Sequence, residues 1–144
     1  MDAANHNHLC SAQTDARATK VPEGYRLAFL PRHFGRLFMQ VESSIYGHMR
    51  DLCPGYTGGY WEFFDLINGG CYMAPAGDAF EIHAPNGHSG TVSGDAAGII
   101  ATLYALSHLA FRFEEATVLS DRFHQLREFA LDHGEAAAIL AAID

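Results

Sequence analysis

The spacing of apolar residues changes twice along this chain, and these changes restrict the folds open to it. Residues 34–52 carry apolar side chains every three or four positions, as on one face of an α-helix. Residues 60–92 carry short apolar runs separated by glycine, proline and asparagine, which is typical of strands joined by turns. The helical spacing returns from residue 93 to residue 143. The pattern predicts an α+β fold of the order α-ββββ-ααα, with about four helices covering one face of a sheet.

The middle region is expected to form four strands, because turn residues divide it into four runs. These runs are residues 60–66, 71–74, 80–84 and 88–92. Asn68-Gly69 lies between the first two, and this dipeptide favours the mirror-image hairpin turns that need positive φ angles. Pro85-Asn86-Gly87 lies between the last two. Consecutive strands joined by such short turns predict a four-stranded antiparallel meander.

The flanking helices have recognisable starts and ends. Pro31 is expected near the start of the first helix, which runs from Phe34 and stops before Pro54. Ser93 is expected to cap the second helix, with Asp95 at the positive end of the helix dipole. Two further helices are expected over residues 119–129 and 135–143. The helix after Ser93 has the widest apolar stripe, so it is expected to be the most buried.

The chain has 144 residues, which is the length of one ordinary domain. Residues 1–20 carry scarcely an apolar anchor and are expected to form a disordered tail, leaving residues 21–144 as a single domain. The N-terminus lacks the pattern of a signal peptide, and no apolar run approaches the roughly 18–20 residues of a membrane helix. The three cysteines form no CxxC pair and do not predict a disulfide framework. We therefore expect a cytoplasmic protein without a membrane partner.

The charges are distributed unevenly along the chain, whose formal net charge is −8. Residues 1–59 hold five acidic and six basic residues, whereas residues 60–144 hold twelve acidic and three basic ones. No lysine or arginine lies between Arg50 and Arg112. A nucleic-acid-binding surface needs a basic face, so direct binding of DNA or RNA is not expected, although the aromatic strands offer platforms on which RNA bases could stack. The acidic region either keeps the protein soluble or faces a basic partner.

No motif in the chain predicts an enzyme. There is no G-x-S-x-G elbow, and the glycine-rich run of residues 55–59 lacks the Lys-Ser/Thr ending of a phosphate-binding loop. No H-x-x-x-H or H-E-x-x-H pair is present, so neither a metal nor a cofactor is expected, with Cys71, His83 and His88 as an alternative metal set. A small hydrolase that uses histidine and carboxylate side chains is the alternative function. Trp61 is expected in the core rather than at a binding site.

Six segments, in order along the chain, resemble the ArdB/KlcA antirestriction family. Two of them are Leu30-Pro31-Arg32-His33-Phe34-Gly35 and Asn68-Gly69-Gly70-Cys71-Tyr72-Met73-Ala74-Pro75. The others are residues 58–63, 93–99, 121–127 and 133–144, so that the resemblance extends over residues 22–144. Gly134 stands where a proline is expected in this family.

The resemblance implies a compact α+β protein without enzymatic activity, carried on plasmids or other mobile elements. It also implies that the protein inhibits host type I restriction-modification systems and so protects incoming DNA. A DNA mimic would need dense negative charge, because B-DNA carries about one charge per 1.7 Å of its axis. A net charge of −8 over 144 residues is too sparse for that. We therefore expect protein contacts, with the type I complex or with a host factor that controls it.

The candidates for such contacts are charged residues that lie in the resembling segments or in the region without arginine. They are Arg32, Glu62, Asp65, Glu81, Asp95, Arg122, Arg127 and Asp144, with Asp78 as a further acidic candidate. Charged residues of this kind also form helix caps and local salt bridges, and the sequence leaves both roles open.

Overall fold

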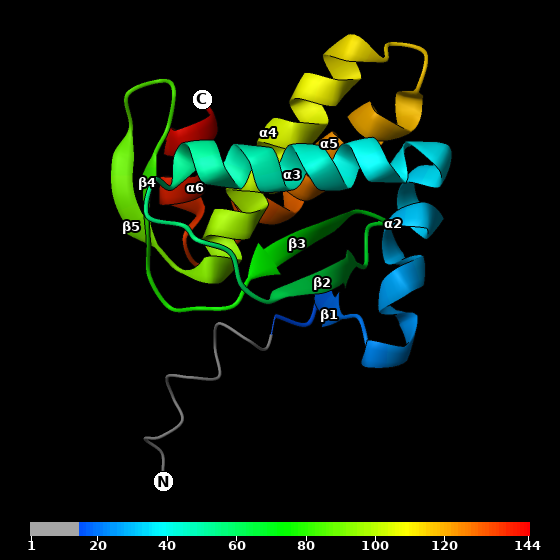
Figure 1. The fold of residues 1–144 in the computed structure, drawn as a ribbon, viewed down its shortest axis with the longest axis horizontal. Coiled ribbons are helices and arrows are strands. Elements are labelled where there is room, and N and C mark those ends of the chain that lie inside the picture. Colours follow the sequence, from blue (N-terminus) through cyan, green and yellow to red (C-terminus); the bar gives the residue numbers. More distant parts are fainter. Residues whose placement is uncertain (1–14) are drawn as a thin grey trace, which may run out of the picture.

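The structure is a computed structural model that describes residues 15–144, and its α+β class is the one expected. The strands are β1 (Ala18–Lys20), β2 (Trp61–Leu66), β3 (Cys71–Pro75), β4 (Phe80–His83) and β5 (Ser89–Val92). The helices are α2 (Arg26–Phe34), α3 (Phe38–Leu52), α4 (Gly94–Arg112), α5 (Thr117–Leu131) and α6 (Ala136–Ile143), with short 3-10 turns at Glu23–Tyr25 and Gly35–Leu37. Figure 1 shows α3 running across the molecule, with α2 at one end and the β4–β5 hairpin at the other.

The strands form two separate sheets, so the predicted four-stranded meander is wrong. β1, β2 and β3 form one antiparallel sheet in that order, and among the described strands β4 pairs only with β5. Both predicted hairpins are present, with Phe64 opposite Tyr72 in one and Ile82 opposite Gly90 in the other. The break therefore falls between β3 and β4.

Helix α4 is the reason that β3 and β4 do not pair. Leu66 and Gly70 form a hydrogen-bonded pair of the β2–β3 ladder, so by alternation the N–H and C=O of Met73 point away from β2. At that edge they meet the hydroxyl of Thr102 on α4, at 3.5 Å each. Gly98 brings the helix backbone so close that an added Cβ would lie 2.2 Å from the Met73 oxygen. The helix thus occupies the place that β4 would take in a meander.

The first predicted helix is in fact two helices. Gly35 has φ +56°, a left-handed conformation that favours glycine, and it ends α2. Phe34 therefore closes α2 rather than opening α3, and Pro31 lies inside α2. The apolar spacing runs across this break because Phe34 and Phe38 both contact the core. The sequence pattern alone does not reveal such a corner.

Helix α4 forms the centre of the core, as predicted. Ile99, Leu103 and Leu106 have no exposed surface. The Ser93 hydroxyl accepts a hydrogen bond from the Ala96 N–H at 3.1 Å, which confirms the expected cap. By length and composition α4 is apolar enough to cross a membrane, but 67% of that stretch is buried inside the fold, as in the core helix of a folded domain.

The predicted disordered tail, residues 1–20, is too long at its C-terminal end. Residues 18–20 form β1, which pairs with β2 and places Ala18 opposite Leu66. Just before β1, Arg17 forms an ion pair with Asp132 at 3.4 Å and stacks over the Phe129 ring at 4.6 Å. A deletion of residues 1–20 would remove both β1 and this anchor. The rest of the predicted tail, residues 1–14, lies outside the described residues.

Candidate functional site

The eight charged candidates do not form one site. Arg32, Asp65 and Arg122 meet in one cluster, and Asp95 belongs to a second. The other four are dispersed: Glu62 forms an ion pair with Lys20 at 3.1 Å, Arg127 forms one with Asp144 at 3.6 Å, and Glu81 lies on β4.

The first cluster, which we call the His33 cluster, joins α2, β2 and α5 and consists of Arg32, His33, Asp65, Arg122 and Gln125. Asp65 accepts two hydrogen bonds from Arg32, at 3.3 and 3.1 Å, and one from His33 Nε2 at 2.6 Å. Arg122 Nε donates to His33 Nδ1 at 3.1 Å, and its Nη1 donates to Gln125 at 3.1 Å. The cluster therefore fixes three elements that are distant in sequence.

The contacts of His33 define its protonation state. Because the guanidinium of Arg122 can only donate, Nδ1 of His33 is the acceptor, and the proton lies on Nε2, where it is donated to Asp65. The His33 side chain is only 7% exposed, so neither nitrogen is open to a substrate. Its contacts are those of a structural residue.

Burial and neighbouring charges shift the pKa values in this cluster. Burial lowers the pKa of His33, and the positive charges of Arg122 and Arg32 lower it further, against the opposing influence of Asp65. For Asp65, burial raises the pKa, but the hydrogen bonds from His33 and Arg32 outweigh it, so its pKa lies below the usual range. The cluster is thus most stable with a neutral histidine and an ionised aspartate.

A histidine with a lowered pKa makes folding stability depend on pH. As the pH falls through the ordinary value of 6.5, the unfolded chain binds this proton before the folded chain does, so stability present above 6.5 is lost below it. His33→Gln retains a donor and an acceptor, and it is expected to flatten this dependence by up to about 1.4 kcal/mol per pH unit. Urea unfolding between about pH 8 and pH 5 measures the effect. An equal change in His83→Gln, which replaces an exposed histidine, would contradict the assignment.

The second cluster, which we call the Asp95 cluster, lies at the first turn of α4 and contains Tyr72, Ser93, Asp95, His133 and Glu135. Asp95 accepts from the Tyr72 hydroxyl at 2.6 Å and from His133 Nε2 at 2.7 Å. The backbone N–H of Glu135 donates to His133 Nδ1 at 2.9 Å, so this histidine is also held as the Nε2–H tautomer. Glu135 in turn accepts from the backbone N–H of Ser93. The cluster attaches β3 and the α5–α6 turn to α4.

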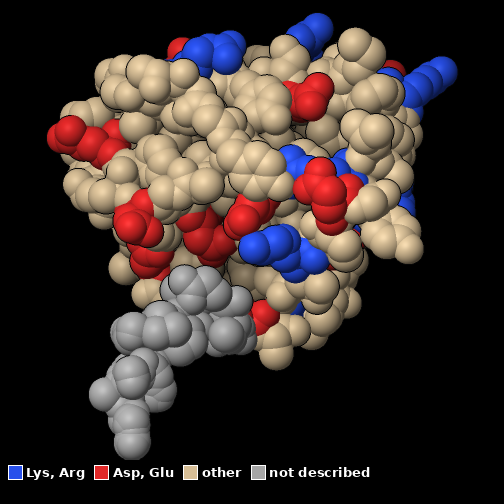
Figure 2. Space-filling view, turned by 60° about the horizontal axis from the view of Figure 1, so that its bottom comes forward, with Lys and Arg blue, Asp and Glu red and all other residues tan. Residues whose placement is uncertain are grey.

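Most of the acidic residues among the eight candidates are paired. Asp65, Asp95, Glu62 and Asp144 each lie beside a basic group or a histidine. Glu81 is 73% exposed, and its carboxylate lies 3.7 Å from His83 Nε2. Figure 2 shows acidic side chains gathered at the lower left of one face of the molecule, with basic side chains beside them and at the upper and right edges. The surface has an acidic region but not a regular row of free carboxylates.

The alternative metal set is not assembled in the described part of the chain. No group of three histidine, cysteine or acidic side chains in residues 15–144 could hold an ion. Cys71 is buried on β3, and burial raises the pKa of its thiol far above the usual range. His83 and His88 belong to the other sheet or its turn.

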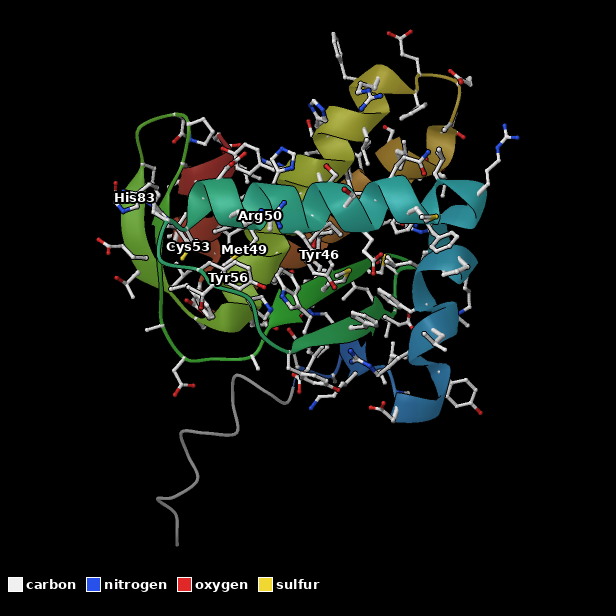
Figure 3. The ribbon with its side chains drawn as sticks, in the orientation of Figure 1. Tyr46, Met49, Arg50, Cys53, Tyr56 and His83 are labelled. Atoms are coloured by element: carbon white, nitrogen blue, oxygen red, sulfur yellow. The ribbon has the colours of Figure 1, made fainter. Side chains whose placement is uncertain are left out.

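Two hollows flank the loop of residues 53–60, which the sequence analysis treated only as a glycine-rich connection. One, of about 340 Å³, lies between the loop and β4 and includes Ala79, Phe80, Glu81 and His83 in its lining. The other, of about 360 Å³, lies between the loop and α3. Figure 3 shows Cys53 and Tyr56 on this loop, between α3 and the hairpin that carries His83. No sequence motif points to these hollows, because they depend on where β4 lies relative to the loop.

Comparison with known proteins identifies the family. A family model described as "Antirestriction protein" matches residues 54–144. The chain is 46% identical over 136 residues to the antirestriction protein KlcA of Escherichia coli, covering 88% of this chain and 92% of that protein. A second KlcA of the same species is 48% identical over 133 residues, covering 88% of this chain and 94% of that protein.

The fold matches as well. A solved structure superposes with a TM-score of 0.82 and 51% identity, covering 88% of this chain and 94% of that one. It is described as a structure of the KlcA and ArdB proteins, which show a novel fold and antirestriction activity against type I DNA restriction systems in vivo but not in vitro. Sequence and fold agree over most of both chains, and they show that this chain belongs to the ArdB/KlcA family of antirestriction proteins.

Proposed function

We propose that this chain counters type I restriction in its host cell and so protects incoming unmodified DNA. The observation that carries this proposal is the match to KlcA, which extends over nine-tenths of the relatives' length in sequence and in fold. The chain would act in the cytoplasm, where restriction enzymes meet DNA.

We infer further that it acts through protein contacts rather than by imitating DNA. A mimic needs free carboxylates spaced like phosphates, about one charge per 1.7 Å of axis. Here Asp65 and Glu62 each form an ion pair with a basic side chain at 3.1 Å, and Asp95 accepts hydrogen bonds from Tyr72 and His133. Direct nucleic-acid binding is also disfavoured, because the acidic region contains no lysine or arginine from residue 51 to residue 111.

The partner is the type I complex or a host factor that controls it. The related proteins act in vivo but not in vitro, which favours a partner or a state of the complex that purified restriction enzyme lacks. Nothing in the structure of residues 15–144 favours the hydrolase alternative. His33 and His133 have both ring nitrogens engaged, so neither has a free nitrogen to serve as a general base.

The proposal predicts that expression of this chain raises the plating of unmodified phage on a strain with an active type I system, while methylation of its target sites stays largely intact. A DNA mimic would occupy the channel used by both activities and lower both. Phage plating and site methylation are measured in the same strain, with a strain lacking the restriction system as the control. Unchanged plating would contradict the antirestriction proposal, and equal loss of restriction and methylation would contradict the mechanism.

A further inference from the structure

One edge of the β4–β5 hairpin has unpaired backbone groups. The Ala84 N–H donates to the His88 oxygen at 2.8 Å, which makes these two residues a hydrogen-bonded pair of the antiparallel ladder. Hydrogen-bonded and non-hydrogen-bonded pairs alternate, so Glu81 and His83 belong to the second kind, and their N–H and C=O groups point away from β5. Within residues 15–144 these backbone groups form no hydrogen bond. The edge is a template for another strand.

This edge opens into the groove beside the loop of residues 53–60. Ala79, Glu81 and His83, which alternate along the edge, all line the groove of about 340 Å³. The corresponding edge of β3 is different, because α4 covers it and Thr102 contacts the backbone of Met73 there. Of these two strand edges, the one on β4 is therefore the one with adjacent free space.

The loop of residues 53–60 forms the opposite wall of the groove and is held in place by hydrogen bonds of Tyr56. The Trp61 indole N–H donates to the Tyr56 hydroxyl at 2.6 Å, and the Tyr56 N–H donates to the Cys53 oxygen at 2.9 Å. Phe80 and Pro75 add apolar surface to the lining. A strand that entered the groove would thus meet hydrogen-bonding groups on β4 and apolar contacts beside them, as in other proteins that bind peptides by strand addition.

The charge of the groove favours a cationic occupant. The lining of the groove contains one acidic residue, Glu81, and neither lysine nor arginine. The Glu81 side chain is 73% exposed. A residue directly opposite Glu81 on an added strand would lie about 5.5 Å away between Cα atoms, where an opposite charge is favourable. No lysine or arginine of the lining would repel a lysine or arginine at that position.

We propose that this groove binds an extended, lysine- or arginine-containing segment of a partner protein as an added strand on β4. This proposal says what kind of segment the partner offers. It rests on the proposed function only where it takes that partner to be the type I complex or a host factor that controls it. Two outward-facing residues, Glu81 and His83, supply the backbone hydrogen bonds, and the Glu81 carboxylate selects the charge.

The test selects short peptides from a random library on the purified full-length chain and then titrates the recovered peptides. His83→Pro removes an outward N–H without breaking the β4–β5 ladder, and proline is tolerated at such an edge position. Ser89→Pro is the matched control, because Ser89 lies opposite His83 and its N–H points to the other side of the hairpin. Glu81→Lys reverses the charge and leaves the edge intact. Thermal melts by circular dichroism confirm that each variant is folded.

The expected peptides are rich in lysine or arginine. They should bind His83→Pro at least about tenfold more weakly, bind Ser89→Pro as they bind the unaltered chain, and bind Glu81→Lys about two- to fivefold more weakly. Failure to recover any peptide, equal binding to all variants, or a β4-mediated dimer of this chain in sedimentation would overturn the proposal. Because binding is measured on purified protein, it is independent of phage plating. If the unaltered chain binds the peptides but does not raise phage plating, the result counts against the proposed function alone.

Discussion

Replacing Trp61 with alanine is expected to lower the free energy of unfolding by about 3–5 kcal/mol, because this is the usual cost of removing a buried tryptophan. The Trp61 side chain is 4% exposed, packs edge-on against Tyr46 at 5.0 Å, and donates its indole hydrogen bond to Tyr56. The alanine would leave a cavity and an unpaired hydroxyl. A loss of this size is a large fraction of the roughly 5–15 kcal/mol that stabilises a typical domain.

Urea unfolding followed by circular dichroism measures this effect. Tyr60→Ala is the matched control, since Tyr60 is the neighbouring aromatic residue and is 55% exposed. The control is expected to change stability by less than about 1 kcal/mol. A Trp61→Ala variant that stays as stable as the unaltered chain but no longer protects phage would show a binding residue instead of a core residue.

The second large effect is expected at Gly98, where the helix backbone contacts a strand without a side chain between them. An added Cβ would lie 2.2 Å from the Met73 oxygen and 2.4 Å from the Ala74 Cα, and both are backbone atoms that cannot move aside cheaply. Gly98→Ala is therefore expected to cost about 3 kcal/mol or more by overpacking, although alanine is the better helix former. At this chain length such a loss corresponds to a fall in melting temperature of roughly 10 °C.

Gly134→Ala separates the contact at Gly98 from the general effect of replacing a glycine. An added Cβ at Gly134 meets no atom within 4 Å, and its φ is not in the left-handed region. This variant is expected to be neutral or slightly stabilising. If both substitutions changed the melting temperature equally, the close packing of α4 on β3 would be refuted as the cause.

Features that depend on neighbours along the chain could be predicted from the sequence. The Ser93 cap, the two hairpins and the buried stripe of α4 follow from turn residues, capping residues and apolar period, which are local properties. The turn at Asn68-Gly69 was predicted only in part, since Gly69 has φ +96° but Asn68 does not share a positive φ. The loop has four residues between β2 and β3, the same number that separates the predicted runs 60–66 and 71–74.

The predicted site residues divide in the same way. The sequence placed Arg32, Asp65 and Arg122 among the candidates from the family segments that contain them, but nothing local shows that all three meet at His33. The residues concerned lie on α2, β2 and α5, and the hydrogen-bonded pair His33 and Arg122 is 89 positions apart. Whether any of the eight candidates contacts a partner stays a prediction.

The sequence by itself determined the α+β class, most of the elements and the family, because periodicity, turn chemistry and family motifs are written in consecutive residues. The tertiary structure alone decided that the strands divide into two sheets, that residues 18–20 add a strand to β2, and that β4 keeps a free edge beside a groove. The physical reason is that a strand edge can be covered by any of several segments that are distant in the sequence, and only the folded chain shows which of them lies there. At the free edge of β3 this place is taken by α4, whose Gly98 and Thr102 lie against the backbone of Met73.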